Sequence, residues 1–77
     1  EITEAKLEAV YKVECALKQM GFTQVRARHH GEVVRIELLP SEWDIAKFKE
    51  IDEAGKAAGF KFTALDLEGY KMGRMNG

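Results

Sequence analysis

Three arginines stand on two neighbouring segments in which apolar and polar residues alternate. Arg26 and Arg28 are separated by one residue, so in an extended strand they project from the same face. Arg35 lies in the next alternating segment, and a tight turn at Gly31 returns it to that face. Guanidinium groups offer paired donors in one plane, which suits phosphate and carboxylate groups. The spacing predicts a small anion site, and it equally fits a solvated edge hairpin whose charges deter aggregation.

Four other residues nearby carry groups that could do chemistry. His29 and His30 are adjacent, so a regular strand directs them to opposite faces and they cannot both ligate one metal ion. Glu14 falls at the edge of an apolar helical stripe, where a glutamate usually faces solvent or pairs with an arginine. Cys15 lies inside the same helix, away from the helix start that would activate a thiol. We expect no metal site and no catalytic residue, with Glu14 and Arg35 as candidate supporting members of the anion site.

These residues belong to a short and nearly neutral chain. It has 77 residues, 45% of them hydrophobic, and its 12 lysine and arginine side chains nearly balance 13 acidic ones. This length allows one small domain, residues 1–77, with one core. The charge balance argues against a general polyanion binder, and no aromatic residue lies among the three arginines to stack bases. Nucleic acid is therefore the weakest of the candidate partners.

The sequence also bears on where the protein works. A single cysteine cannot form an internal disulfide, which favours a reducing compartment. No segment approaches the roughly 20 apolar residues of a membrane span, and the first residues lack a basic region and a hydrophobic signal core. We expect a cytoplasmic protein with no membrane partner. The chain begins with Glu1 rather than Met, which suggests a piece of a longer protein.

A helix and a hairpin are predicted to position the arginines. Residues 4–20 carry apolar side chains at helical spacing, with Thr3 as the cap and Gly21 as the stop signal. The period then changes to two on both sides of Gly31, which predicts an antiparallel hairpin. In a hairpin with a two-residue turn, the residue numbers of each cross-strand pair add up to an odd number. Paired residues point to the same face of the sheet, so the three arginines share one face with Glu37. The opposite, apolar face consists of Val25, Ala27, Val34, Ile36 and Leu38.

A second helix and a third strand complete the pattern. Pro40 and Ser41 are expected to open the helix, and Ser41 with Asp44 matches a capping box. Its buried stripe is expected to consist of Ile45, Phe48, Ile51, Gly55 and Ala58. Residues 60–67 are apolar on both sides, which indicates a third strand that is central or well covered.

The predicted order is therefore helix, strand, strand, helix, strand. It corresponds to an α+β two-layer sandwich with both helices on one face of the sheet, a ferredoxin-like pattern that lacks its first strand. If the missing strand belongs between the second and third strands, upstream chain, a partner or closure of the sheet itself must fill the gap. A small core and an incomplete sheet both favour self-association into a homo-oligomer.

Two spaced motifs suggest a family. Residues 26–31 read Arg-x-Arg-His-His-Gly, and residues 65–70 read Leu-Asp-Leu-x-Gly-Tyr. With these motifs, nearly the whole chain resembles the C-terminal domain of the ATP-dependent sacrificial sulfur transferases. These are PP-loop ATP pyrophosphatases that make the nickel-pincer nucleotide cofactor of lactate racemase.

The resemblance implies a role within a larger enzyme. In that family an N-terminal PP-loop domain adenylates a carboxylate of a pyridinium mononucleotide, and a cysteine of the same protein gives up its sulfur. The PP-loop signature is absent here and Cys15 does not match the donor motif, so the resemblance assigns ATP and Mg to a domain outside this chain. It implies that Arg26 and Arg28 contact the substrate phosphate and that Glu14 matches a site acid. It also implies a hexameric assembly with contacts through this domain.

We therefore expect a substrate-phosphate-binding and oligomerisation domain that binds an anionic mononucleotide and works with a PP-loop domain or subunit. The chain by itself is expected to lack adenylation activity, because no phosphate-cradling loop is visible. Two alternatives stay open. One is a small-molecule-binding regulatory domain without a link to sulfur transfer, and the other is an RNA-binding hairpin module.

Overall fold

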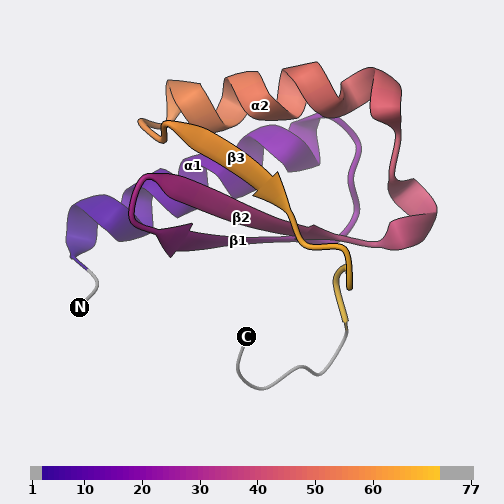
Figure 1. Ribbon diagram of the computed structural model, residues 1–77, viewed down its shortest axis with the longest axis horizontal. Helices are drawn as coiled ribbons and strands as arrows, with labels where there is room; N and C mark the ends of the chain where they lie inside the picture. Colours follow the sequence, from indigo (N-terminus) through magenta and orange to yellow (C-terminus); the bar gives the residue numbers. More distant parts are fainter. Residues whose placement is uncertain (1–2, 72–77) are drawn as a thin grey trace.

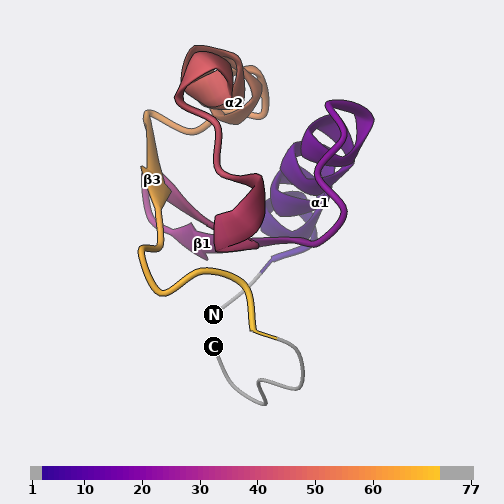
Figure 2. The ribbon, with the colours of Figure 1, turned by 90° about the vertical axis from the view of Figure 1, so that its right-hand side faces the viewer.

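Two helices cover one face of a mixed β-sheet in the computed structural model, which describes residues 3–71 (Figure 1). The end-on view in Figure 2 shows both helices on the same side of the sheet. This is the predicted α+β two-layer arrangement. In chain order the elements are α1 (Glu4–Gln19), β1 (Val25–His30), β2 (Val33–Leu38), the 3-10 turns η1 (Pro40–Glu42) and η2 (Ile45–Lys47), α2 (Phe48–Ala57) and β3 (Phe62–Leu65).

The first helix has the predicted ends. The Thr3 side chain accepts a hydrogen bond from the Lys6 backbone N–H at 3.2 Å, which satisfies one of the free donors of the first turn. At the other end Gly21 has a φ of 107°, which a residue with a side chain rarely adopts. The Phe22 N–H then donates back to the Leu17 carbonyl at 3.3 Å. The turn folds Phe22 into the core beneath α1.

The hairpin has the predicted register and faces. Strands β1 and β2 pair antiparallel around Gly31 and Glu32, with Arg28 opposite Arg35. The residue numbers of every pair add up to an odd number, so Val25, Ala27, Val34, Ile36 and Leu38 share the face that the helices cover. The buried apolar core consists of Val13, Leu17, Phe22, Val25, Ala27, Val34, Ile36, Leu38, Ile51 and Phe60.

The start of the second helix differs from the prediction. Trp43 donates its backbone N–H to the Pro40 carbonyl, which closes η1 as a separate 3-10 turn. Trp43 and Asp44 then adopt extended backbone angles, and the Asp44 side chain caps η2 by accepting the Ala46 N–H at 3.0 Å. The N-cap residue of α2 is Lys47, so Ser41 does not cap this helix. The helix therefore begins at Phe48, and Ile45 is 81% exposed instead of belonging to the buried stripe.

The prediction for the third strand was wrong in its bounds and its place. Strand β3 covers Phe62–Leu65 and forms an edge of the sheet, where it pairs parallel to β2. Phe62 is 56% exposed, whereas Phe60 turns into the core before the strand starts. At the other end the Asp66 side chain accepts the Glu68 N–H at 2.9 Å, which closes a turn and ends the strand. Direct pairing of β2 with β3 shows that the sheet itself closes the gap of the missing strand.

The two helices can be compared with the length and apolar character of a membrane-spanning helix. Within residues 3–71, neither is long and apolar enough to cross a membrane.

Candidate anion site

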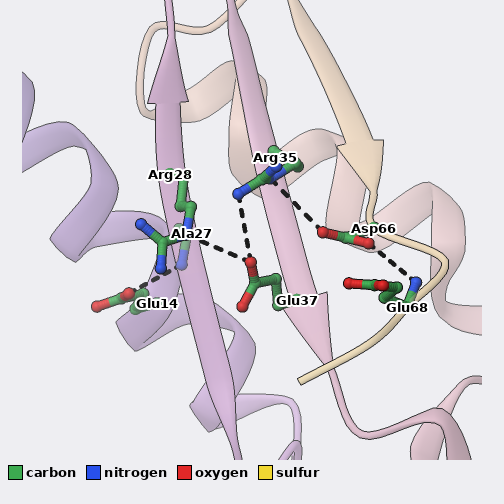
Figure 3. Close-up of polar contacts among 7 residues, drawn as sticks. All are labelled: Glu14, Ala27, Arg28, Arg35, Glu37, Asp66 and Glu68. Atoms are coloured by element: carbon green, nitrogen blue, oxygen red, sulfur yellow. Dashed lines mark hydrogen bonds and ion pairs between the residues drawn. The ribbon is translucent and has the colours of Figure 1, made fainter. Parts of the chain in front are cut away.

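The three arginines lie on the face of the sheet that the helices leave open. Arg26 and Arg28 come from β1, and Arg35 comes from β2. Glu37 faces Arg26 in the register of the hairpin, so it stands on the same face. Figure 3 shows the central contacts of this open face.

Glu37 connects two of the arginines through a single oxygen. Its Oε2 accepts a hydrogen bond from Arg28 Nε and another from Arg35 Nη2, both at 3.3 Å (Figure 3). The Glu37 side chain is only 1% exposed, so these ion pairs compensate for burying a charge. Arg28 and Arg35 therefore converge on a carboxylate of the chain itself, and Arg26 does not join them.

Arg35 has a second acidic neighbour. Its Nε lies 3.8 Å from Oδ2 of Asp66, the residue that follows β3. The Arg35 guanidinium therefore has two carboxylate neighbours, one from β2 and one from the end of β3. Its role in the site is to fix Glu37 and to tie β2 to the end of β3.

Arg26 and one nitrogen of Arg28 have no hydrogen-bond or ion-pair partner among the described residues. Within the described residues, no hydrogen bond or ion pair involves the Arg26 guanidinium, although the residue is half-buried. Arg28 donates a hydrogen bond from its Nε to Glu37. Its Nη2 is buried and has no hydrogen-bond partner in the described part of the chain. A buried donor without an acceptor costs free energy that an incoming anion can recover.

A groove of about 340 Å³ lies along the outer edge of β1, and Arg26 and Arg28 are among its lining residues. Its volume falls in the range of small-molecule pockets. One wall belongs to α1 and combines apolar side chains with one carboxylate, and the other is the polar edge of β1. The lining residues are Leu7, Val10, Glu14, Arg26, Ala27, Arg28, His29 and His30.

Glu14 enters this groove from α1 and binds backbone. Its Oε2 accepts the Ala27 N–H at 2.9 Å (Figure 3). In the hairpin ladder this N–H points away from β2, so it would otherwise be an open donor on the sheet edge. Among the described residues, the Glu14 carboxylate therefore binds backbone and does not pair with an arginine, as the sequence pattern would also have allowed. Sequence patterns could place Glu14 beside the strand. They could not show which backbone N–H it accepts, because that depends on the angle at which α1 packs on the sheet.

The remaining candidate residues have ordinary contacts. The His29 ring stands edge-on to Phe60 with ring centroids 5.2 Å apart, whereas His30 is exposed at the end of β1. In the described chain, no cluster of three histidine, cysteine or acidic residues could hold a metal ion. Cys15 hydrogen-bonds to Tyr11, and this contact raises the pKa of the exposed Tyr11 hydroxyl above its usual value.

Comparison with known proteins relates the chain to part of a larger enzyme. The chain is 38% identical over 82 aligned positions to an uncharacterized protein of Synechocystis, a match that covers 99% of this chain and 30% of the relative. It is 34% identical over 77 positions to the pyridinium-3,5-bisthiocarboxylic acid mononucleotide synthase of Lactiplantibacillus plantarum, covering 97% of this chain and 28% of that enzyme. No family model matches the chain. The chain is thus a distant homologue of a region of that synthase, and it spans less than a third of the length of these relatives.

Proposed function

We propose that this chain binds the phosphate of a pyridinium mononucleotide as part of a PP-loop, ATP-dependent sulfur transferase, and that it also contributes to the oligomeric assembly. The homologous synthase carries a pyridinium mononucleotide in its name, which supports the substrate class. The observation that carries the proposal is the pair of available guanidinium donors, Arg26 and Arg28, at one groove.

The groove offers guanidinium donors to an anion. Its charged lining side chains are Arg26, Arg28 and Glu14, which leaves one positive charge among the lining residues. Arg26 is the member without a carboxylate partner among residues 3–71. In this proposal Arg26 binds one phosphate oxygen and the Nη2 of Arg28 binds another.

Glu37 serves this site by holding Arg28 in place. An arginine that is already fixed by a hydrogen bond at Nε loses less side-chain freedom when its Nη2 binds a ligand. Glu37 is itself buried and bound by Arg35, so the whole unit is rigid before the ligand arrives. Leu7 and Val10 form the apolar wall against which the ring and ribose of a mononucleotide would lie.

The chemistry of sulfur transfer lies outside the chain in this proposal. Adenylation needs positioned phosphate ligands and a metal ion, and these are assigned to a PP-loop domain or subunit that binds ATP and Mg. The part played here is substrate binding and orientation, which raises the rate of a reaction by fixing the reacting groups in place.

Titration calorimetry with nicotinic acid mononucleotide tests the proposal. Replacing Arg26 or Arg28 with Ala should weaken binding by about 10- to 100-fold, the scale of one charge-assisted hydrogen bond. Lys at either position should restore only part of the affinity, because an ammonium group cannot make the planar two-point contact. Lys49→Ala, on the exposed side of α2, is the matched loss of a positive charge and should leave binding unchanged.

Two further probes separate the phosphate from the ring. Inorganic phosphate should bind weakly and depend on the same arginines, whereas nicotinic acid riboside, which lacks the phosphate, should not depend on them. Equal affinities in the wild type and both alanine variants, or no measurable binding of the mononucleotide by the wild type, would contradict the proposal. Binding of unrelated anionic metabolites with equal affinity would favour the regulatory alternative.

A further inference from the structure

The Leu-Asp-Leu-x-Gly-Tyr motif folds back onto β2 after β3 ends. The Asp66 N–H donates a hydrogen bond to the Ile36 carbonyl at 2.8 Å. Four residues later, the Tyr70 N–H donates to the Leu38 carbonyl, also at 2.8 Å. Ile36 and Leu38 are the residues on either side of Glu37 in β2. The turn is therefore fastened to β2 on both sides of the buried Glu37 carboxylate.

Close packing and a side-chain hydrogen bond fix the shape of this turn. Gly69 has a φ of 84°, and an added Cβ would lie 2.7 Å from Pro40 Cγ. Only a glycine lets the backbone pass this closely. At the start of the turn, the Asp66 side chain accepts the Glu68 N–H at 2.9 Å. The motif thus holds the Asp66 carboxylate in one place.

This carboxylate is the last member of a row of charges across the sheet. Arg28 Nε and Arg35 Nη2 both donate to Glu37 Oε2 (Figure 3). On the other side of the row, Arg35 Nε lies 3.8 Å from Asp66 Oδ2. Four charges of alternating sign therefore run from β1 through β2 to the end of β3. With two strand spacings between them, Arg28 and Asp66 lie about 10 Å apart.

We propose that Asp66 is a positioning residue for the anion site and acts on Arg28 through Arg35 and Glu37. The proposal rests on the proposed function, because it assigns Asp66 a role toward the same ligand. Nε and Nη2 form the planar edge of a guanidinium group that suits a two-point contact with one carboxylate. In Arg35 this edge is divided, with Nη2 toward Glu37 and Nε toward Asp66.

The division of this edge keeps Glu37 within reach of Arg28. Without the charge of Asp66, Arg35 is free to turn the whole edge onto Glu37. The Glu37 oxygen that Arg28 shares would then be drawn toward β2, and Arg28 would lose the hydrogen bond that fixes its Nε. An arginine that is not fixed loses more side-chain freedom when it binds a ligand, so the affinity for the anion would fall.

A simple charge effect of Asp66 would have the opposite sign. Removing a negative charge near an anion site raises the local positive potential and should tighten the binding of a phosphate. Loss of positioning should weaken it. A charge effect over about 10 Å is also largely screened at 0.15 M salt, whereas contacts within a half-buried row of side chains are screened much less. The sign of the change in affinity at this salt concentration therefore distinguishes the two effects.

Asp66→Asn tests the proposal without opening the turn. The amide oxygen can still accept the Glu68 N–H, whereas the charge that faces Arg35 is lost. In titration calorimetry we expect nicotinic acid mononucleotide to bind about 5-fold more weakly, within the range of coupling through contact networks. Asp52→Asn, the same change at an aspartate that is ion-paired with Lys56 on α2, should leave binding unchanged. Equal or tighter binding by Asp66→Asn would overturn the proposal.

A double-mutant cycle tests the route through Arg35. Arg35→Lys keeps a positive charge, but an ammonium group has no planar edge that two carboxylates could share. This variant should weaken mononucleotide binding by a similar factor, and adding Asp66→Asn to it should cause no further loss. Losses that simply add would show that Asp66 does not act through Arg35, which would overturn the proposal.

An NMR signal of Arg28 separates this inference from the proposed function. In the chain without ligand, the Arg28 Nε–H is hydrogen-bonded to Glu37 and should exchange slowly with water. Asp66→Asn should speed this exchange several-fold, and Asp52→Asn should not. A wild-type chain that binds no mononucleotide would overturn the proposed function and this role together. A chain that binds it, with Arg28 exchange unchanged by Asp66→Asn, would overturn the positioning alone.

Discussion

The two edge strands of this sheet differ in the partners of their outward backbone groups. On the β1 side, a carboxylate from α1 occupies the outward N–H of Ala27, and the neighbouring arginines are held by Glu37. On the β3 side the outward groups of Thr63 and Leu65 have no strand partner in the described sheet, and the surface beside them is apolar. An outward backbone donor of the β1 edge is thus satisfied by α1, whereas no strand of the described sheet covers the outer side of β3.

The difference also concerns what stabilises each side. Charged hydrogen bonds connect β1, β2 and α1, while close contact of small residues connects β3 with α2. Substitutions can therefore weaken one side and leave the other largely intact.

Gly55→Val should break the packing of the β3 side. A Cβ at this position would lie 2.3 Å from Thr63 Oγ1 and 3.2 Å from Val34 Cγ1, so α2 and β3 would have to move apart. Overpacking of this kind costs about 3 kcal/mol. Ala57→Val, at an exposed position of the same helix, is the control and should cost less than about 1 kcal/mol. Urea unfolding followed by circular dichroism measures both, and an equal loss in the two variants would contradict the close contact.

Glu37→Gln should weaken the charged side of the sheet. The amide keeps the shape of the side chain but removes the charge that Arg28 and Arg35 share. We expect a loss of about 2 kcal/mol, the scale of hydrogen bonds to a charged group, together with weaker mononucleotide binding because Arg28 is no longer fixed. Glu32→Gln serves as the control, since its ion pair with Lys61 is solvent-exposed and worth little. Unchanged stability in Glu37→Gln would show that the ion pairs do not hold the strands.

Glu14→Ala should open the β1 edge. It removes one hydrogen bond from a carboxylate to the Ala27 N–H, which should cost about 1 kcal/mol. The freed edge should also increase concentration-dependent association through β1, seen by sedimentation as species larger than those of the wild type. Glu8→Ala, at an exposed position of the same helix, should change neither property. If Glu14→Ala also leaves association unchanged, the carboxylate does not protect the edge.

Glu42→Gln should have the smallest effect and a pH signature. Hydrogen bonds from the Thr23 side chain and backbone lower the pKa of the Glu42 carboxyl and connect η1 to the start of β1. A lowered pKa means that the charged form stabilises the fold, fully above the unfolded pKa and less as the pH falls through the folded one. Glu42→Gln should therefore be slightly less stable than the wild type at neutral pH and nearly equal to it in acid. Thermal unfolding at both pH values measures the difference, and a constant gap would contradict it.

Much of the fold could be predicted from residue patterns. Helix caps and strand alternation depend on local chemistry, which is why the bounds of α1 and the register of the hairpin were predicted correctly. The start of α2 was not, because Pro40 and Asp44 each close their own short turn, and a pattern cannot show which of two competing caps wins. The position of β3 depends on which element occupies the place of the missing strand beside β2. That is a property of the whole sheet and not of a local pattern.

The candidate site was predicted in outline. Alternation placed Arg26, Arg28 and Arg35 on one face, and the structure puts them there. The alternation did not show that Glu37 would form ion pairs with Arg28 and Arg35. The signal for these ion pairs was the position of Glu37 on the same face. Only the distances between side chains separate an arginine that serves an internal carboxylate from one that is available to a ligand.

The chain between β2 and β3 is long, and this has a kinetic consequence. Gly31 and Glu32 alone separate β1 from β2, whereas residues 39–61 separate β2 from β3. Closing a longer loop costs more entropy, so the hairpin can form early in folding and the parallel strand joins last. Local unfolding would then begin at β3, and hydrogen exchange should be faster in β3 than in β1. The hairpin that carries Arg26 and Arg28 would keep its ladder during such openings.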